Sequence, residues 1–313
     1  MVNINRRTFL NNSTLLSGGL FLKGNNQQQE EFRPDFNIPT DFSLKIYATD
    51  WGFPGTIDKF CAKTKEAGYD GIEVWFPADA KKQKELLEAL ERHQLSIGIL
   101  AAGGDRGFEK HLSQFQASVE LAAEQQPDFI NCHSGRDYFT FEQNRQLIDF
   151  TTKVSESSGI PIYHETHRGR MLFAAHIAKN YLQTIPELQL TLDISHWCNV
   201  HESLLQDQPE TVTMALNRTG HVHSRIGHAE SPQVTDPRAP EWSEAVAVHW
   251  TWWDQVVKNH VDQGKPLTMT TEFGPPHYLA TVPYTRQPLA NQWDINVFMM
   301  DQWRKRYAPT EGR

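Results

Sequence analysis

The chain has 313 residues, a hydrophobic content of 39% and a formal net charge of −8 from 38 acidic and 30 basic residues. This composition allows a buried core, and the acidic balance argues against a nucleic-acid partner, because binding to a phosphate backbone favours a basic face. No apolar run reaches the roughly 18 to 20 residues that cross a bilayer. The three cysteines are too few and too scattered for a disulfide framework or a CxxC zinc site.

The amino terminus resembles an export signal. An Arg6-Arg7 pair precedes a short, weakly apolar stretch, which is typical of twin-arginine signals, although no A-x-A cleavage site follows. A frayed amphipathic terminus is the alternative. We expect an export signal at residues 1–24, a polar linker at 25–43 and a single catalytic domain at 44–313. The expected location is the periplasm, or the cytoplasm if the signal does not function.

Beyond the linker, short apolar runs alternate with longer stretches of helical spacing. Alternation of strands and helices implies a parallel sheet, and eight such units match an α/β fold of the (β/α)8 TIM-barrel type. A doubly wound open sheet is the rival, but no GxGxxG fingerprint follows the first strand. The predicted strands are residues 44–49, 71–76, 95–100, 129–132, 161–164, 190–194, 220–223 and 267–271.

The ends of the last four predicted strands hold Glu165, Asp193, His223 and Glu272. Barrel enzymes place their active sites at the carboxyl ends of strands, so these side chains are expected to converge. Three carboxylates and one imidazole suit one divalent metal ion: Mn²⁺, Mg²⁺, Co²⁺ or Zn²⁺. A divalent cation would also relieve the repulsion among three buried carboxylates. Taken singly, each acid has an alternative role as a loop cap or a surface ion-pair partner.

Four motifs then resemble the xylose isomerase-like TIM-barrel superfamily of sugar isomerases and epimerases, over roughly residues 44–305. They are HETHRGR at 164–170, LTLDISHW at 190–197, GHVHSR at 220–225 and TTEFGPP at 270–276. The resemblance implies that the four strand-end residues hold one divalent metal, with Glu165 and Glu272 also acting as acid and base. It implies that His196 contacts substrate. The arginine that the epimerases carry beyond the seventh strand has no clear match in this sequence. Arg225 is the arginine that follows that strand here.

The sequence thus predicts a metal-dependent sugar isomerase or epimerase. Such an enzyme abstracts a proton α to a carbonyl and forms an enediolate, which the metal stabilises as a Lewis acid. The partner is then a small carbohydrate, and a homo-oligomer is possible. Residues expected to hold substrate, each with ordinary packing or hydrogen bonding as its alternative, are His133, His167, His196, Arg225, Trp75, Trp51 and His228.

Three other functions remain open. A metal-dependent lyase or dehydratase acting on a keto-sugar or inositol derivative would use the same proton abstraction and then expel a hydroxyl. An abasic-site endonuclease of this fold would need three zinc ions and a cationic groove, which the net charge of −8 disfavours. A non-catalytic sugar-binding barrel would bind no metal.

Overall fold

The computed structural model describes residues 32–310, and the expected export signal therefore lies outside the described residues. Eight parallel strands form a closed barrel in chain order, so the predicted (β/α)8 fold is confirmed and the open sheet is excluded. The predicted strands agree with the observed ones to within a few residues at each end. The strands are β1 (Leu44–Thr49), β2 (Gly71–Trp75), β3 (Ser96–Ala102), β4 (Phe129–His133), β5 (Ile162–Glu165), β6 (Leu190–Leu192), β7 (Thr219–His223) and β8 (Leu267–Thr271).

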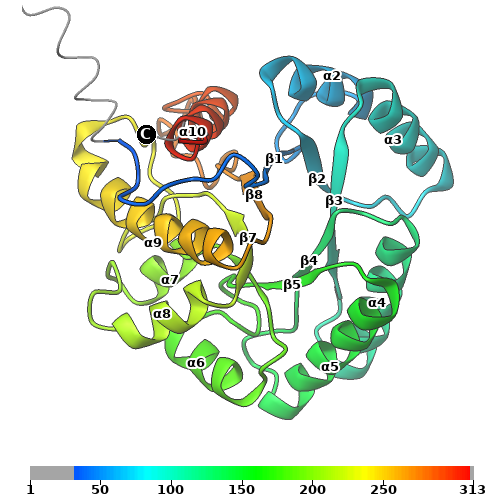
Figure 1. The fold of residues 1–313 in the computed structure, drawn as a ribbon. Coiled ribbons are helices and arrows are strands. Elements are labelled where there is room, and N and C mark those ends of the chain that lie inside the picture. The colour runs from blue at the N-terminus through cyan, green and yellow to red at the C-terminus, as the bar shows by residue number, and fades with distance from the viewer. Residues whose placement is uncertain (1–31, 311–313) are drawn as a thin grey trace, which may run out of the picture.

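Helices surround the barrel as an outer ring (Figure 1). Several begin at side-chain caps that satisfy free backbone N–H groups; Asp79 and Thr140, for example, accept from Lys82 N and Gln143 N. None of the helices in residues 32–310 combines the length and apolar character needed to span a bilayer. They are α2 (Ile57–Ala67), α3 (Ala80–His93), α4 (Phe108–Glu124), α5 (Phe141–Ser158), α6 (Ala175–Thr184), α7 (Ser195–Val200), α8 (Pro209–Leu216), the 3₁₀ turn η1 (Pro240–Trp242), α9 (Ser243–Asp262) and α10 (Gln292–Arg306).

Pairing of the first and last strands closes the barrel. The register runs from Leu44 opposite Leu267 to Ala48 opposite Thr271. Most residues of the strands are buried whichever face they point to, so the strands lack strict alternation of apolar and polar residues; β7, TGHVH, is buried throughout. Closure brings the carboxyl ends of β5, β6, β7 and β8 to one rim together with those of β1 and β2.

Strand β6 is short, and its end fixes one functional residue. The register against β7 shifts between Leu190 and Thr191, and the strand stops at Leu192. The next residue, Asp193, donates its backbone N–H to Oγ1 of Thr166, 2.9 Å away, in the loop after β5. The side chain of Asp193 is therefore held at the rim instead of being carried further along the sheet.

The tryptophans of the last two helices form part of the core. Trp250 and Trp253 of α9 pack edge to face, with ring centroids 4.8 Å apart, and Trp303 of α10 lies 5.3 Å from Trp253. The rings of Trp253 and Trp303 are fully buried. These rings therefore pack the outer helices against one another and the barrel.

The described part of the expected linker packs against the barrel. Ile38 is buried, and its backbone exchanges hydrogen bonds with Thr310 beyond α10. The ring of Phe32 packs edge to face on Trp250. Residues 32–43 therefore pack beside the segment that follows α10, so the two ends of the described chain lie next to each other.

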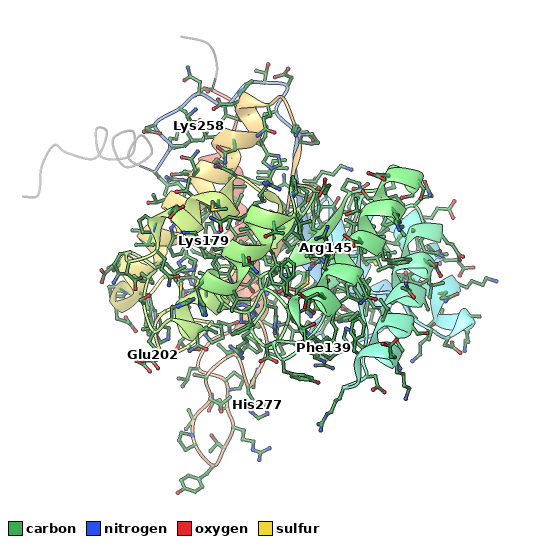
Figure 2. The ribbon with its side chains drawn as sticks, turned by 90° about the horizontal axis from the view of Figure 1, so that it is seen from below. Phe139, Arg145, Lys179, Glu202, Lys258 and His277 are labelled. Atoms are coloured by element: carbon green, nitrogen blue, oxygen red, sulfur yellow. The ribbon has the colours of Figure 1, made fainter. Side chains whose placement is uncertain are left out.

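Functional loops gather at one end of the barrel. In Figure 2, Phe139, Glu202 and His277, from loops that follow or lead away from the carboxyl ends of strands, lie at the lower end, whereas Lys258 near the end of α9 lies at the upper end. The segment between β8 and α10 projects furthest and carries an antiparallel bridge between Thr281 and Pro288. The lower end in this view is therefore the end of the barrel to which the carboxyl ends of the strands point.

Candidate metal centre and active site

The four strand-end residues converge as expected. Glu165 ends β5, Asp193 follows β6, His223 ends β7 and Glu272 follows β8. One ligand atom from each lies within 4.8 Å of the ligand atoms of the others. Nδ1 of His223 is 2.8 Å from Oε2 of Glu272 and 3.5 Å from Oε1 of Glu165. This is a compact cluster of three oxygen donors and one nitrogen donor.

Several buried atoms of this cluster approach one another closely without forming hydrogen bonds of regular geometry. Within the described chain, these are both carboxylate oxygens of Glu165 and Nδ1 of His223, although His133 and Glu272 lie within ion-pair distance of them. A buried polar group without a partner is costly, so such atoms call for an ion or a ligand. The donor set therefore fits a divalent cation, which Glu165, Asp193, His223 and Glu272 would hold.

The other nitrogen of His223 faces a fourth acid, Glu73, that the sequence did not single out. Nε2 of His223 lies 3.0 Å from Oε2 of Glu73, which sits within β2. Glu73 is also contacted by Nδ2 of Asn131, at 2.9 Å, and by Oγ1 of Thr270. Burial would raise the pKa of the Glu73 carboxyl, but the imidazoles of His223 and His221 lower it well below its usual value. Glu73 therefore fixes the orientation of His223 with Nδ1 toward the acids.

Arg225 is a buried cation inside the acidic cluster. Its Nη2 pairs with the carboxylate of Asp193 and lies 3.0 Å from Oε2 of Glu272 and 3.2 Å from Nε2 of His196. Burial would lower the pKa of Arg225, but Asp193 and Glu272 raise it above its ordinary value. Arg225 compensates part of the negative charge of the cluster.

Three imidazoles line one side of the centre. The ring of His167 lies 3.9 Å from that of His196 and 5.2 Å from that of His133, measured between centroids. Nε2 of His133 is 2.5 Å from Oε2 of Glu165. Burial lowers the pKa of His167 to about 4, so this ring is neutral at pH 7 and can both donate and accept a hydrogen bond.

Aromatic side chains from the loops after β1 and β8 also lie at the rim. The ring of Trp51, which follows β1, packs edge to face on that of Tyr278 at 5.0 Å. The guanidinium groups of Arg225 and Arg168 lie 4.7 and 4.9 Å from the centroid of Tyr278. Both Trp51 and Tyr278 are partly exposed. The sequence predicted Trp51 but not Tyr278, which lies in the loop after β8.

Trp75 and His228, which were also predicted to hold substrate, lie in different places, and only Trp75 is close to the cluster. Trp75 ends β2, is 49% exposed, and packs edge to face on His133 at 5.2 Å, which places it on the rim. His228 is not brought to the cluster by any contact within the described residues: its ring packs on Trp242 at 4.6 Å, and its Nδ1 accepts from Glu230 N. The loop that carries His228 turns back on itself through a bridge to Ser231.

A cavity of about 520 Å³ lies at the other end of the barrel. It is lined by residues at or just before the starts of strands, among them Pro161, Gln189, Thr219 and Pro266. The candidate ligands are at the opposite ends of the same strands. This cavity therefore does not coincide with the candidate metal centre.

Solved structures with the same fold include several enzymes. The chain resembles 3-keto-D-glucoside 4-epimerase from E. coli at 17% identity and a TM-score of 0.58, covering 84% of this chain and 99% of that one. It resembles a D-tagatose 3-epimerase-like protein at 14% identity and a TM-score of 0.53, covering 83% and 97%. An AP endonuclease of family 2 from Brucella melitensis gives 14% identity and 0.51, covering 74% and 93%. At these identities the likeness shows the fold alone.

No curated protein matches the chain in sequence. The family model described as "Xylose isomerase-like TIM barrel" matches residues 61–233, which is more than half of the chain. This match spans strands β2 to β7 completely, and it includes Glu165, Asp193 and His223. Together with the closed eight-stranded barrel, it shows that the chain belongs to the xylose isomerase-like TIM-barrel family.

Proposed function

We propose that this protein is a divalent-metal-dependent isomerase or epimerase of a keto-sugar. The observation on which the proposal depends is the convergence of buried ligand atoms from Glu165, Asp193, His223 and Glu272, all within 4.8 Å of one another. A divalent cation held there would polarise a carbonyl oxygen of the substrate and so acidify the neighbouring C–H bond. Mn²⁺, Mg²⁺, Co²⁺ and Zn²⁺ all suit the donor set.

Glu165 and Glu272 are the proposed acid and base. They come from β5 and β8, which are three strands apart around the ring, so their carboxylates reach the centre from different directions. One carboxylate can then remove the proton α to the carbonyl while the other returns a proton from another side, as inversion of a carbon centre requires. Transfer between adjacent carbons needs only one of them.

Neighbouring side chains would position the sugar. The imidazoles of His133, His167 and His196 and the guanidinium of Arg225 offer hydrogen bonds to hydroxyl groups around the acids. Across the rim, the rings of Trp51 and Tyr278 offer an apolar wall of the kind that packs on a sugar face. Trp75 extends the wall on the side of His133.

The test is hydrogen exchange at the reacting carbon. Metal-free protein is reconstituted with each of the four cations and incubated in D₂O with a panel of ketoses, aldoses and 3-keto-glucosides. The last are included because the E. coli neighbour is named for such a substrate. We expect deuterium at the carbon α to the carbonyl of one sugar class. Glu165→Gln should abolish the exchange while remaining folded, and Glu124→Gln, at the exposed end of α4, is the matched control.

Two outcomes favour the rival functions. Loss of water from the sugar, detected by mass spectrometry, would identify a dehydratase that uses the same proton abstraction. Protein that binds sugar but retains none of the four cations after dialysis would be a sugar-binding barrel, and the isomerase proposal would then be wrong. Near-normal exchange in Glu165→Gln would also contradict the assigned base.

A further inference from the structure

Three loops meet beside the candidate metal centre. Nη2 of Arg136, in the loop after β4, donates to the backbone oxygen of Gly104 after β3, at 2.9 Å. The backbone N–H of Met171, in the loop after β5, donates to the oxygen of Ser134 at 3.0 Å. Arg170, which directly precedes Met171, is thereby held next to the loop that contains Arg136.

These two arginines have no carboxylate partner. Within residues 32–310 neither Arg136 nor Arg170 forms an ion pair, although each is half-buried. Asp137, the adjacent acid in sequence, is exposed to solvent. The side chain of Arg170 makes no hydrogen bond to any described residue. Unpaired guanidinium groups are usually solvated, so their partial burial together needs an explanation.

Both arginines and His111, which packs against Gly103 beside the Gly104 acceptor of Arg136, have buried nitrogen atoms without partners in the described residues. They are Nε of Arg136, Nη1 of Arg170 and Nε2 of His111. His111 is fully buried on α4, and its Nδ1 lies 3.1 Å from the backbone oxygen of Asp105. Burial lowers the pKa of His111, and the charges of Arg136 and Arg170 lower it further. All three side chains therefore share one positive local field.

The charge of Glu165 also acts on Arg170. Burial and the charge of Arg136 lower the pKa of Arg170, whereas the carboxylates of Glu165 and Asp137 raise it. Ser134, whose oxygen anchors the Arg170 loop, immediately follows His133 on β4. An anion beside Arg170 would thus lie next to the reacting part of a substrate bound near Glu165.

We propose that Arg136 and Arg170, with His111, bind an anionic oxygen group of the substrate, either a carboxylate or a phosphate. Guanidinium groups bind such groups through paired N–H donors, and an anion would satisfy the orphaned nitrogens and neutralise the like charges. This inference rests on the proposed function, and it narrows the substrate to an acidic sugar, a uronate-type keto-acid or a sugar phosphate.

The first experiment compares neutral and anionic substrates. Metal-loaded protein is assayed with a neutral ketohexose, its 6-phosphate and a ketohexuronate. We expect kcat/KM to be at least tenfold higher for one of the two anionic sugars, which also identifies the anion. Arg170→Gln should lower that value at least tenfold and change the value for the neutral sugar by less than twofold. Arg145→Gln, on the surface of α5, removes the same charge away from the loops and should change neither.

A second readout does not depend on turnover. Since Arg170 is a half-buried cation without a partner, Arg170→Gln should raise the melting temperature of ligand-free protein, whereas loss of a merely structural arginine would lower it. Titration calorimetry should show weaker binding of the preferred anionic sugar to Arg170→Gln, with Arg170→Lys between this variant and the natural protein.

The two proposals can fail separately. Equal kcat/KM for neutral and anionic sugars, unaffected by Arg170→Gln, would overturn the anion site and leave the isomerase proposal intact. No proton exchange on any sugar would contradict the isomerase proposal, while calorimetry would still decide whether Arg170 binds the anion. Equal affinities in the natural protein and Arg170→Gln would show that only water occupies the site.

Discussion

Nε2 of His223 lies 3.0 Å from Oε2 of Glu73, a contact that crosses the barrel from β7 to β2. It forms a carboxylate–imidazole pair whose free nitrogen, Nδ1, faces Glu165 and Glu272. Such pairs fix the tautomer and the orientation of a metal-binding histidine. Glu73 is therefore the residue that would position His223 for the proposed metal ion.

Replacement of Glu73 should weaken metal binding before it affects the fold. We expect Glu73→Gln to reduce the affinity for the bound cation by about 10- to 100-fold, in the range seen for outer partners of metal ligands. Competition with a chelator measures this without a substrate. Glu124→Gln provides the surface control. An unchanged metal affinity in folded Glu73→Gln would show that Glu73 only fills the barrel interior.

The sequence predicted the barrel and the four converging residues because both depend on local signals. Alternating apolar runs and helical segments specify where the strands lie. Glu165, Asp193, His223 and Glu272 stand at or directly after the ends of the last four strands, so the sequence alone places them there. The parallel sheet then brings all carboxyl ends to one rim, so convergence follows from topology without knowledge of any side-chain contact.

Glu73 could not be found in the same way. It lies inside β2, in the apolar run GIEVW, where an acid resembles an ordinary solvent-facing residue of a strand. Its importance depends on His223, which is 150 residues away and meets it only when the barrel closes. Tyr278 was missed for another reason: the loop after β8 has no periodicity, so its course over the rim depends on contacts with Trp51 and the arginines.

Arg225 was predicted to bind substrate, yet it also pairs with two candidate ligands. In Arg225→Met, the carboxylates of Asp193 and Glu272 lose a buried cation, so the metal-free variant should lose about 3 to 5 kcal/mol of unfolding free energy. Added Mn²⁺ should restore more stability to this variant than to the natural protein, because it supplies the missing charge. Chemical denaturation with and without the cation measures the difference, and Arg145→Met is the control. Equal stabilisation of both proteins would contradict the role.

Tyr278 should contribute its ring and not its hydroxyl. Its ring contacts Trp51 and both Arg168 and Arg225, whereas its hydroxyl forms no hydrogen bond to a described residue. Tyr278→Phe should therefore keep kcat/KM within about twofold, and Tyr278→Ala should lower it several-fold, since a cation–π contact contributes about 1 kcal/mol. Steady-state kinetics on the preferred sugar separate the two variants. A large loss in Tyr278→Phe would show that the hydroxyl contacts substrate.

A buried histidine far from the ligands should make stability depend on pH. His249 is fully buried on α9, where Nδ1 lies 2.8 Å from the oxygen of Ala245 and Nε2 accepts the N–H of Gly227 at 3.2 Å. Since Nε2 is an acceptor, the neutral ring fits the site, and burial lowers its pKa to about 4.

The direction of this pH dependence follows from the protonation of His249 in the folded and unfolded chains. Its folded pKa of about 4 lies below the unfolded value near 6.5, so the unfolded chain binds more protons at intermediate pH. The contribution of His249 to the unfolding free energy is therefore fully present above pH 6.5 and decreases as the pH drops toward 4. The loss between pH 7 and 5 is about 2 kcal/mol. His249→Gln cannot take up this proton, so urea denaturation at the two pH values should show a difference smaller by that amount than in the natural protein. An equal difference in both proteins would mean that His249 is protonated in the folded state and that Gly227 N–H is satisfied by another group.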